Sequence, residues 1–427
     1  MNQWPKRKAS AWAQNAYQAC PGNAATGSRT VAALLTVAVG RPSYYLHGVI
    51  SISEQKEPAT LRKSVILLCA ISFLSPSGLL GTRVVGDANS ENRIRLTLDS
   101  SEAEQVFSIL ALRREGKAVS DAEWQTLFAT EAYQRLKKRE QQIAEMYHQS
   151  DLVFTDEDFK KFVLSLDPQQ QAAELQTTLD KWKTVDLRGS AERVLTYLPH
   201  EATINAKVYP LIKPRHNSFV FEPSTNPAIM LYLDPSESSA KFENTVAHEL
   251  HHIGLGSLGP VYDKKLAGLP ERAHEAAEWM GAFGEGMAML AAAGGPDVDP
   301  HAASSEADRK RWQHDLANFN ADLQSVDAFF LDTLSGKLGD KSAVTEKAST
   351  FFGVQGPWYT VGYRMCVMVE KRFGRDKLIE TMLDPRQLLV LYNSAATEHN
   401  ATLKEGADAS DRLPLWSGEM LKQVGAE

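Results

Sequence analysis

The chain has 427 residues, a length that accommodates two or three domains. It is 43% hydrophobic and 23% charged, the ordinary balance of a globular protein that buries a core. Its net charge of −7 is uneven, because nine Lys and Arg against three Asp and Glu give the stretch up to Asp87 a charge of +6 and leave −13 for the remainder. An acidic body argues against nucleic acid or anionic lipid as a partner, since both favour positive charge.

The first 88 residues differ from the rest. Residues 1–60 lack a sustained apolar period, and we interpret them as a disordered segment or an over-extended reading frame. In residues 61–88 the basic pair Arg62-Lys63 precedes an apolar run at 64–74 and then small residues, the pattern of a secretory signal. The run is too short for a membrane span, which takes about 20 residues. We therefore expect export to the periplasm or the medium. The alternative is a disordered tail followed by a buried helix, in a cytoplasmic protein.

The body of the chain starts with a helical stretch and continues with a strand-rich one. From Ser101 to about Leu198 the pattern is helical with several N-cap signals, including a Ser-x-x-Glu capping box at Ser101, and we expect residues 89–198 to form a helical scaffold. Residues 199–295 begin with three short runs rich in β-branched and aromatic residues, which predict a small sheet: 202–212, 217–223 and 228–235. The same part then continues into helices.

Residues 296–427 are predicted to be a C-terminal helical part, with loops at 294–305 and 335–341. Cys366 is the single cysteine of the body, so no internal disulfide is expected there and an inert buried thiol is favoured. The predicted fold class is mainly α with a small β-sheet (α+β). A zincin-like active-site helix is expected to pack on that sheet.

The strongest chemical signal is the segment HELHH at residues 248–252. His248 and His252 are four residues apart, so on a helix they project from one face and can share a Zn²⁺ ion. Glu249 lies beside the first histidine, where a carboxylate can take a proton from metal-activated water. His251 is the alternative second ligand, but only His252 leaves Glu249 at the catalytic spacing. The competing interpretation is an amphipathic helix whose histidines are solvated and bind no metal.

A third protein ligand is expected to complete the site and leave one position open for water. Glu285 is the favoured candidate, because it stands in an apolar helical segment where a carboxylate is costly unless it is paired or binds a metal. The flanking Gly284 and Gly286 are expected to let this segment approach the histidine helix closely. We predict that this site binds Zn²⁺.

Other acidic and imidazole groups precede this segment. Glu278 and His274 are the alternative third ligands. Glu275 and Glu278 are also candidates for orienting a ligand imidazole through a hydrogen bond. The competing interpretation of both glutamates is an ordinary helix surface.

VAHELHHIG followed by GEGMAML resembles the gluzincin arrangement, in which a later helix adds a glutamate ligand to HExxH. More narrowly, the chain resembles uncharacterised bacterial families of zinc-dependent peptidases, often with export signals. The resemblance covers about residue 100 to the C-terminus. The metzincin pattern does not fit, because Leu255 and Leu258 stand where that pattern has Gly and His.

The gluzincin resemblance implies a further group that hydrogen-bonds the oxyanion. The candidates lie in the segment from Gly353 to Leu383, where Tyr359 and Tyr363 are four residues apart on a predicted helix and Arg364 follows them. A phenol or a guanidinium can stabilise the charge of a tetrahedral intermediate. Tyr at helical spacing is otherwise an ordinary core residue.

These expectations combine into a zinc-dependent metallohydrolase, a peptidase acting on a peptide or protein substrate. The run 228–235 is a candidate for holding the substrate backbone by β-addition, or is an ordinary core strand. The alternatives are a zinc hydrolase of a non-peptide substrate and a catalytically silent binding protein stapled by zinc. Glu249 separates the last two classes, because a structural staple needs no general base beside its ligands.

Overall fold

The computed structural model describes residues 93–146, 154–223, 225–404, 406, 408 and 411–426, with the backbone of three earlier strands. These strands form an antiparallel sheet in the order β1-β2-β3: β1 (Thr30–Leu34), β2 (Val49–Ser53) and β3 (Ser64–Leu68). Apart from them, the predicted tail (1–60) and the signal-like segment (61–88) lie outside the described residues. In the part of the chain that is described, no helix is long and apolar enough to cross a membrane.

Six helices form most of the N-terminal half: α3 (Ser101–Arg114), α4 (Asp121–Phe128), α5 (Glu131–Met146), α6 (Asp156–Ser165), α7 (Gln170–Lys183) and α8 (Leu187–Leu195). Ser120 and Glu123 form a reciprocal capping box at α4. The capping box predicted at Ser101 is not formed. The N-cap of α3 is Ser100, and the backbone N–H of Ser101 donates to Asp99 at 2.9 Å.

A four-stranded mixed sheet lies between these helices and those of the C-terminal half. Its strand order is β4-β5-β7-β6: β4 (Ile94–Leu98), β5 (Ile204–Leu211), β6 (Phe219–Phe221) and β7 (Ala228–Tyr232). β4 and β7 pair with β5 in parallel, and β6 pairs with β7 antiparallel. Pro210 fits within β5 because β4 ends opposite Val208, so no ladder hydrogen bond is missing on that side.

The position of β7 overturns one expectation. Both edges of β7 are occupied, by β5 on one side and β6 on the other. An added peptide strand needs a free sheet edge. The run 228–235 is therefore a core strand, and its predicted role in β-addition is wrong.

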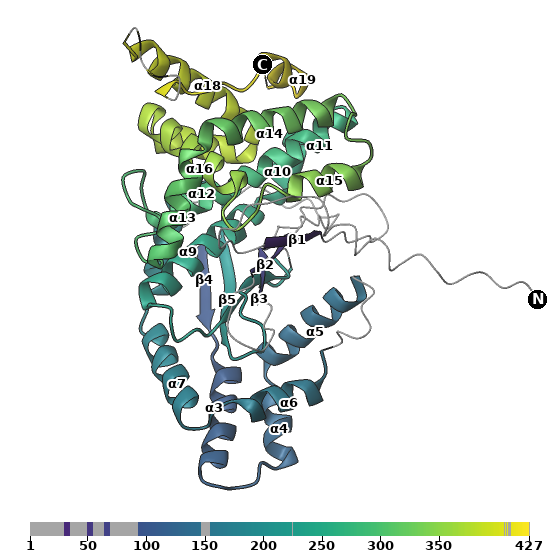
Figure 1. Ribbon diagram of the computed structural model, residues 1–427, viewed down its shortest axis with the longest axis vertical. Coiled ribbons are helices and arrows are strands. Elements are labelled where there is room, and N and C mark those ends of the chain that lie inside the picture. Colours follow the sequence, from purple (N-terminus) through teal and green to yellow (C-terminus); the bar gives the residue numbers. More distant parts are fainter. Residues whose placement is uncertain are drawn as a thin grey trace, which may run out of the picture.

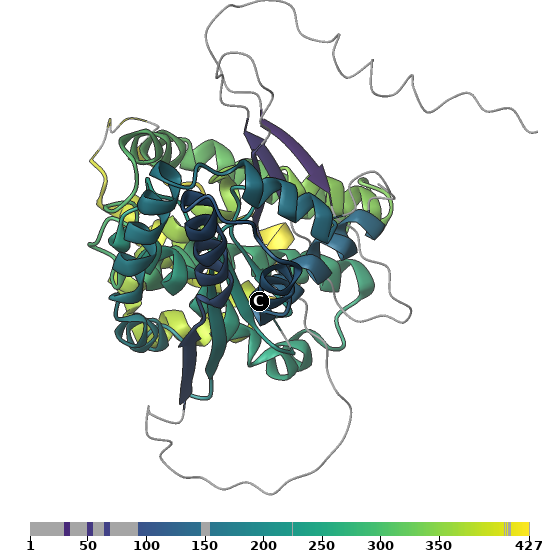
Figure 2. The same ribbon diagram turned by 90° about the horizontal axis from the view of Figure 1, so that it is seen from below.

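The C-terminal half is almost entirely helical: α9 (Ser239–Gly256), α10 (Gly259–Leu266), α11 (Glu271–Met280), η2 (Gly281–Phe283), α12 (Gly284–Ala293), α13 (Glu306–Ala317), α14 (Phe319–Leu334), α15 (Lys341–Ser349), α16 (Pro357–Phe373), α17 (Arg375–Glu380), η3 (Thr381–Leu383), α18 (Pro385–Thr402) and α19 (Gly418–Gln423). In Figure 1, α3, α4, α6 and α7 form the lower end of the molecule, and α11, α14, α18 and α19 lie at the upper end. Seen from below, the blue helices of the N-terminal half lie in front of the green and yellow ones (Figure 2).

One helix, α9, connects the sheet to the upper helices. It packs on β5 and α8 so closely that a Cβ at Gly254 would lie 2.3 Å from Leu198 Cδ1 and 3.4 Å from Ile204 Cγ1. On its N-terminal half, Phe242 stacks on Trp182 of α7 at 4.2 Å between ring centroids. The fold class predicted from the sequence, mainly α with a small sheet, is confirmed. The sheet side of α9 is fixed by packing, which leaves its other side for chemistry.

Glu102 is a fully buried carboxyl group in the first turn of α3. It accepts a hydrogen bond from the backbone N–H of Ile212 at 3.0 Å. Burial raises the pKa of Glu102 to about 8, against the opposing effects of that hydrogen bond and of Lys213. The folded state thus keeps a proton that the unfolded chain loses above pH 4.5. This contribution to stability is full below pH 4.5 and is lost as the pH rises through 8.

Glu102→Gln removes this titration and keeps an acceptor for Ile212. We expect the free energy of unfolding of the variant, relative to wild type, to grow by up to about 1.4 kcal/mol per pH unit between pH 5 and pH 8. Urea denaturation at several pH values measures it. A difference that does not change with pH would show that Glu102 is ionised in the fold.

Candidate metal centre

The two histidines of the motif lie on the buried side of α9. The helix starts at the N-cap Ser238, whose side chain accepts from the backbone N–H of Lys241, and it continues without a break through the motif. His248 and His252 are both buried, and their ring centroids lie 4.7 Å apart at an interplanar angle of 78°. Helical spacing of four residues thus places two imidazoles beside each other with their Nε2 atoms 3.1 Å apart.

Glu285 of α12 completes a cluster of three donor atoms. Its Oε2 lies 3.1 Å from Nε2 of His248 and 3.2 Å from Nε2 of His252. Among the described residues, these three form the group whose geometry could hold a metal ion. Donor atoms at this spacing subtend about 100° at a metal 2.0–2.1 Å from each, close to the tetrahedral angle that Zn²⁺ prefers. We call these three residues the donor triad.

Within the donor triad and at the adjacent Glu249, each charged group affects the pKa of the others. Burial alone would raise the pKa of Glu285, but the imidazoles of His252 and His248 outweigh it and hold that pKa far below its usual value. Glu249 is half-buried beside the triad. Burial raises the pKa of Glu249 and the charge of Glu285 adds to the rise, while the two imidazoles oppose it. A carboxyl with a raised pKa next to a metal cluster is suited to accept and return a proton.

The helix that carries Glu285 is apolar, as the sequence indicated. The side chains from Met287 to Ala292 are all buried, and Glu285 is 5% exposed. The two glycines, however, do not face α9 as expected. Gly286 contacts α16, and a Cβ at Gly284 would meet nothing within 4 Å. Each residue along a helix turns by about 100°. Gly286 therefore faces a different neighbour from Glu285.

Tyr359 of α16 also reaches the triad. The helix starts after the N-cap Gly356 with Pro357 in its first turn, a favourable position for proline. Tyr359 is 3% exposed, and its ring lies nearly parallel to that of His248, with centroids 6.3 Å apart. Of the three residues that the sequence offered for the oxyanion, this one lies beside the donor triad.

Tyr363 and Arg364 lie elsewhere on α16. The Tyr363 hydroxyl donates to the backbone carbonyl of Val298 at 3.5 Å, and its ring packs edge-on against Trp312. The Arg364 guanidinium lies over the ring of Phe319, 4.6 Å from its centroid. The structure therefore does not bring the Arg364 side chain to the donor triad.

The alternative ligands on α11 line a separate hollow of about 550 Å³. Glu278 lies 3.8 Å from Nδ1 of His274 and 3.9 Å from Nζ of Lys341, and Glu275 lines the same hollow. Burial raises the pKa of Glu278 to about 7. The 3₁₀ turn η2 follows α11 and changes the helical phase before α12, so Glu278 and Glu285 do not share a face.

His251 does not join the donor cluster either. It is fully buried, and its ring lies edge-on to His252 with centroids 6.2 Å apart. Burial lowers the pKa of His251 well below the usual value for histidine. A neutral buried imidazole is therefore expected at this position.

Sequence reasoning missed His301, which lies in the loop between α12 and α13. It is 2% exposed, and its ring packs against Trp312 at 4.9 Å. Its Nδ1 lies 3.1 Å from Ser304 Oγ, and its Nε2 accepts from the Gln355 amide at 3.1 Å. Burial lowers the pKa of His301 to about 4, and repulsion from Lys241 adds to the effect. The loop after the ligand helix is thus tied to the segment that starts α16. A lone histidine in a loop gives no sequence signal for this contact.

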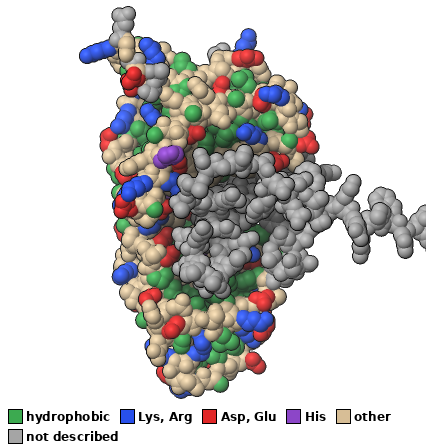
Figure 3. All heavy atoms as spheres, in the orientation of Figure 1, with side chains coloured by type: hydrophobic (Ala, Val, Ile, Leu, Met, Phe, Trp, Pro, Cys, Tyr) green, Lys and Arg blue, Asp and Glu red, His purple; other side chains and the backbone are tan. Residues whose placement is uncertain are grey.

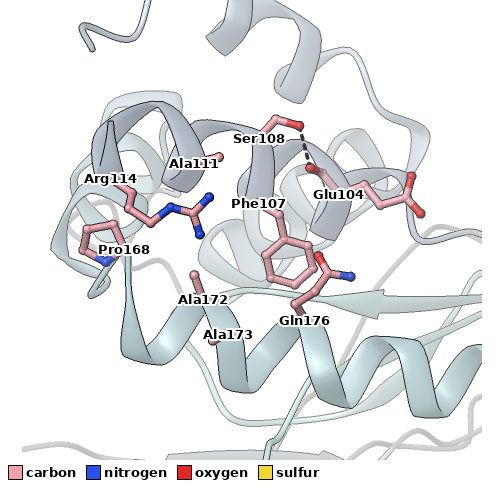
Figure 4. Close-up of a pocket in the computed structure, with 9 residues that line it drawn as sticks. All are labelled: Glu104, Phe107, Ser108, Ala111, Arg114, Pro168, Ala172, Ala173 and Gln176. Atoms are coloured by element: carbon pink, nitrogen blue, oxygen red, sulfur yellow. Dashed lines mark hydrogen bonds between the residues drawn. The ribbon is translucent and has the colours of Figure 1, made fainter. Parts of the chain in front are cut away.

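Other surface features lie away from the triad. A hollow of about 400 Å³ separates α3 from α7, with an apolar floor between Glu104 and Arg114 (Figure 4). On the face drawn in Figure 3, acidic and basic side chains alternate over the described surface. Neither feature adds a metal-binding side chain to the donor triad.

The ligand set can be tested with one pair of substitutions. Glu285→Ala removes one donor atom, and we expect the affinity for Zn²⁺ to fall by more than about 100-fold. Glu278→Gln is the matched control, because it alters a half-buried glutamate of the preceding helix and is expected to leave zinc affinity unchanged. Competition with a chromophoric chelator measures both. An equal loss of zinc affinity in the two variants would show that Glu285 is not a zinc ligand.

A comparison with protein families agrees with this geometry. A family model described as "Putative zinc dependent peptidase (DUF5700)" matches residues 124–401, more than half of the chain. The matched stretch contains the donor triad, Glu249 and Tyr359. No curated protein and no solved structure matches the chain. The chain belongs to the DUF5700 family.

Proposed function

We propose that this protein is a zinc-dependent metallopeptidase of the gluzincin kind, which hydrolyses amide bonds in peptide or protein substrates. The observation that carries the proposal is the donor triad of His248, His252 and Glu285 with Glu249 directly beside it. Two imidazoles and one carboxylate are the ligand set of a catalytic zinc site that keeps one position open. The description of the family supports the peptidase assignment.

Each residue of the site has its own role in the proposed hydrolysis. Bound zinc supplies a Lewis acid that polarises the substrate carbonyl and lowers the pKa of water. Glu249, directly beside the triad, would accept the proton of the attacking water and return it to the leaving amine. Zinc would take the imidazoles of His248 and His252 as neutral ligands, and the buried Glu285 would contribute one negative charge to the site.

Tyr359 is the proposed oxyanion donor. Its ring lies parallel to that of His248, a metal ligand, so its phenol is carried on the same side of α16 as the triad. A phenolic O–H that donates to the developing oxyanion lowers the barrier more than it favours the bound substrate. Tyr363 and Arg364 have other partners and are not assigned this role.

Catalysis fits the site better than a structural staple does. Structural zinc sites are usually closed by four protein ligands. Among the described residues, the cluster offers three. A staple also has no use for a half-buried carboxyl adjacent to its first ligand. Hydrolysis of a non-peptide amide or ester would use the same groups, and a substrate screen separates it from peptidase activity.

Glu249→Gln is expected to abolish turnover and keep the metal. The amide preserves the shape of the side chain but cannot accept the proton, and loss of a general base costs about 100- to 10,000-fold. Hydrolysis of fluorescently labelled casein and of quenched peptides measures activity, while metal analysis measures zinc. A variant that retains zinc and wild-type turnover would exclude Glu249 as the base.

Tyr359→Phe is expected to lower kcat by about 100-fold, the loss seen when one oxyanion donor is removed, with little change in KM. Tyr363→Phe is the matched control on the same helix, and its hydroxyl contacts the Val298 carbonyl. The control is expected to stay within about twofold of wild type. Steady-state kinetics at equal zinc content compares them, and the reverse ranking would move the oxyanion role to Tyr363.

A further inference from the structure

The helix that carries the ligand Glu285 and the helix that carries Tyr359 touch through glycine. At their crossing, Gly286 of α12 lies against the backbone of α16 at Gly362. A Cβ built on Gly286 would lie 1.9 Å from the Tyr363 nitrogen, 2.3 Å from the Gly362 carbonyl carbon and 2.6 Å from the Tyr359 carbonyl oxygen. Backbone atoms have no alternative rotamer, so a methyl group here can fit only if the helices separate.

The contact is reciprocal. A Cβ on Gly362 would lie 2.7 Å from the Phe283 carbonyl oxygen and 3.3 Å from the Gly286 Cα. Ordinary contact between carbon atoms needs about 3.5 Å. A methyl at Gly286 thus requires a separation on the order of 1 Å or more, and a methyl at Gly362 requires less.

Both functional side chains lie within one helical turn of this crossing. Glu285 immediately precedes Gly286, and Tyr359 is three residues before Gly362. The two side chains meet at the same imidazole, because the Glu285 carboxylate is 3.1 Å from His248 and the Tyr359 ring packs parallel to His248. The distance between α12 and α16 at the glycines therefore fixes where the phenol lies relative to the ligand carboxylate.

Helix α16 is held near both of its ends, on either side of the crossing. The Tyr197 hydroxyl donates to the Glu370 carboxylate at 3.0 Å, and the Trp358 indole N–H donates to the Ala348 carbonyl at 2.9 Å. These contacts oppose a movement of the whole helix. A methyl at the crossing would thus bend α16 between these two anchors, where Tyr359 and Gly362 lie, or tilt α12 and move Glu285.

We propose that Gly286 and Gly362 are positioning residues for the reaction, which set the separation between the metal ligand Glu285 and the oxyanion donor Tyr359. The proposal rests on the proposed function for the role of Tyr359, but its effect on Glu285 concerns metal geometry alone. A misplacement of 1 Å in a catalytic group can cost about 100-fold in rate. The expected effect of a single methyl group is therefore large.

The experiment compares alanine at the two crossing glycines with alanine at a glycine outside the crossing. Gly286→Ala and Gly362→Ala place a methyl at the contact. Gly284→Ala is the matched control, because it is on the other side of Glu285 in the same helix and its Cβ would meet nothing within 4 Å. Val361→Ala is a second control, which removes buried volume from α16 without adding atoms at the crossing.

Two readouts separate positioning from stability. The visible absorption spectrum of the Co²⁺-substituted protein reports the geometry of the ligands, and kcat and KM with labelled casein report the reaction. Thermal melting identifies a temperature at which each variant is folded. We expect Gly286→Ala to shift the Co²⁺ spectrum, and Gly362→Ala to lower kcat at least tenfold at unchanged zinc content. Gly284→Ala should match wild type, and Val361→Ala should lower stability alone.

Unchanged spectra and rates in both crossing variants would overturn the proposal, as would an equal loss of kcat in Val361→Ala. Failure of both crossing variants to fold would also overturn it, because the glycines would then be requirements of the fold. A wild-type protein without hydrolytic activity would contradict the proposed function. In that case the Co²⁺ spectrum of Gly286→Ala still decides whether the crossing positions Glu285.

Discussion

The structure depends on the meeting of two imidazoles and one carboxylate whose side chains are all buried. An isolated buried carboxylate would take up a proton, because burial raises the free energy of the charged form. Glu285 instead keeps a pKa far below its usual value, since His252 and His248 lie against it. Three helices are arranged around this point: α9 brings the imidazoles, α12 the carboxylate and α16 a phenol. The rest of the protein holds these helices at the required separations.

The supporting contacts are local and varied in kind. The sheet side of α9 is fixed by close packing at Gly254, and its start is held to α7 by the stacked pair Trp182 and Phe242. The Tyr197 hydroxyl connects the end of α8 with Glu370 of α16. Packing therefore holds α9, and a hydrogen bond holds α16. Together these contacts allow a mostly apolar core to position the few charged atoms of the donor triad.

The sequence contains the local part of this information. Helical spacing pairs His248 with His252, and an acid in an apolar run marks Glu285, so neither step needs tertiary structure. Other features depend on which helices become neighbours, and no local sequence pattern predicts those neighbours. Among them are the side to which Gly286 faces, the contacts of Arg364 and the position of His301. The strand β4 was missed for the same reason, because five residues ahead of the first predicted helix find their partner only in β5. The central place of β7 likewise follows from the pairing order.

The pairing of β4 with β5 has a consequence for how the protein is handled. β4 covers the backbone edge of β5 along five residue pairs, from Ile94 opposite Ile204 to Leu98 opposite Val208. Without β4, the row of N–H and C=O groups on β5 would face solvent as a template for strands of other molecules. A shortened form that begins at α3 would keep all three residues of the donor triad and still expose an unpaired sheet edge that can bind other strands. Its aggregation would then say nothing against the integrity of the metal centre.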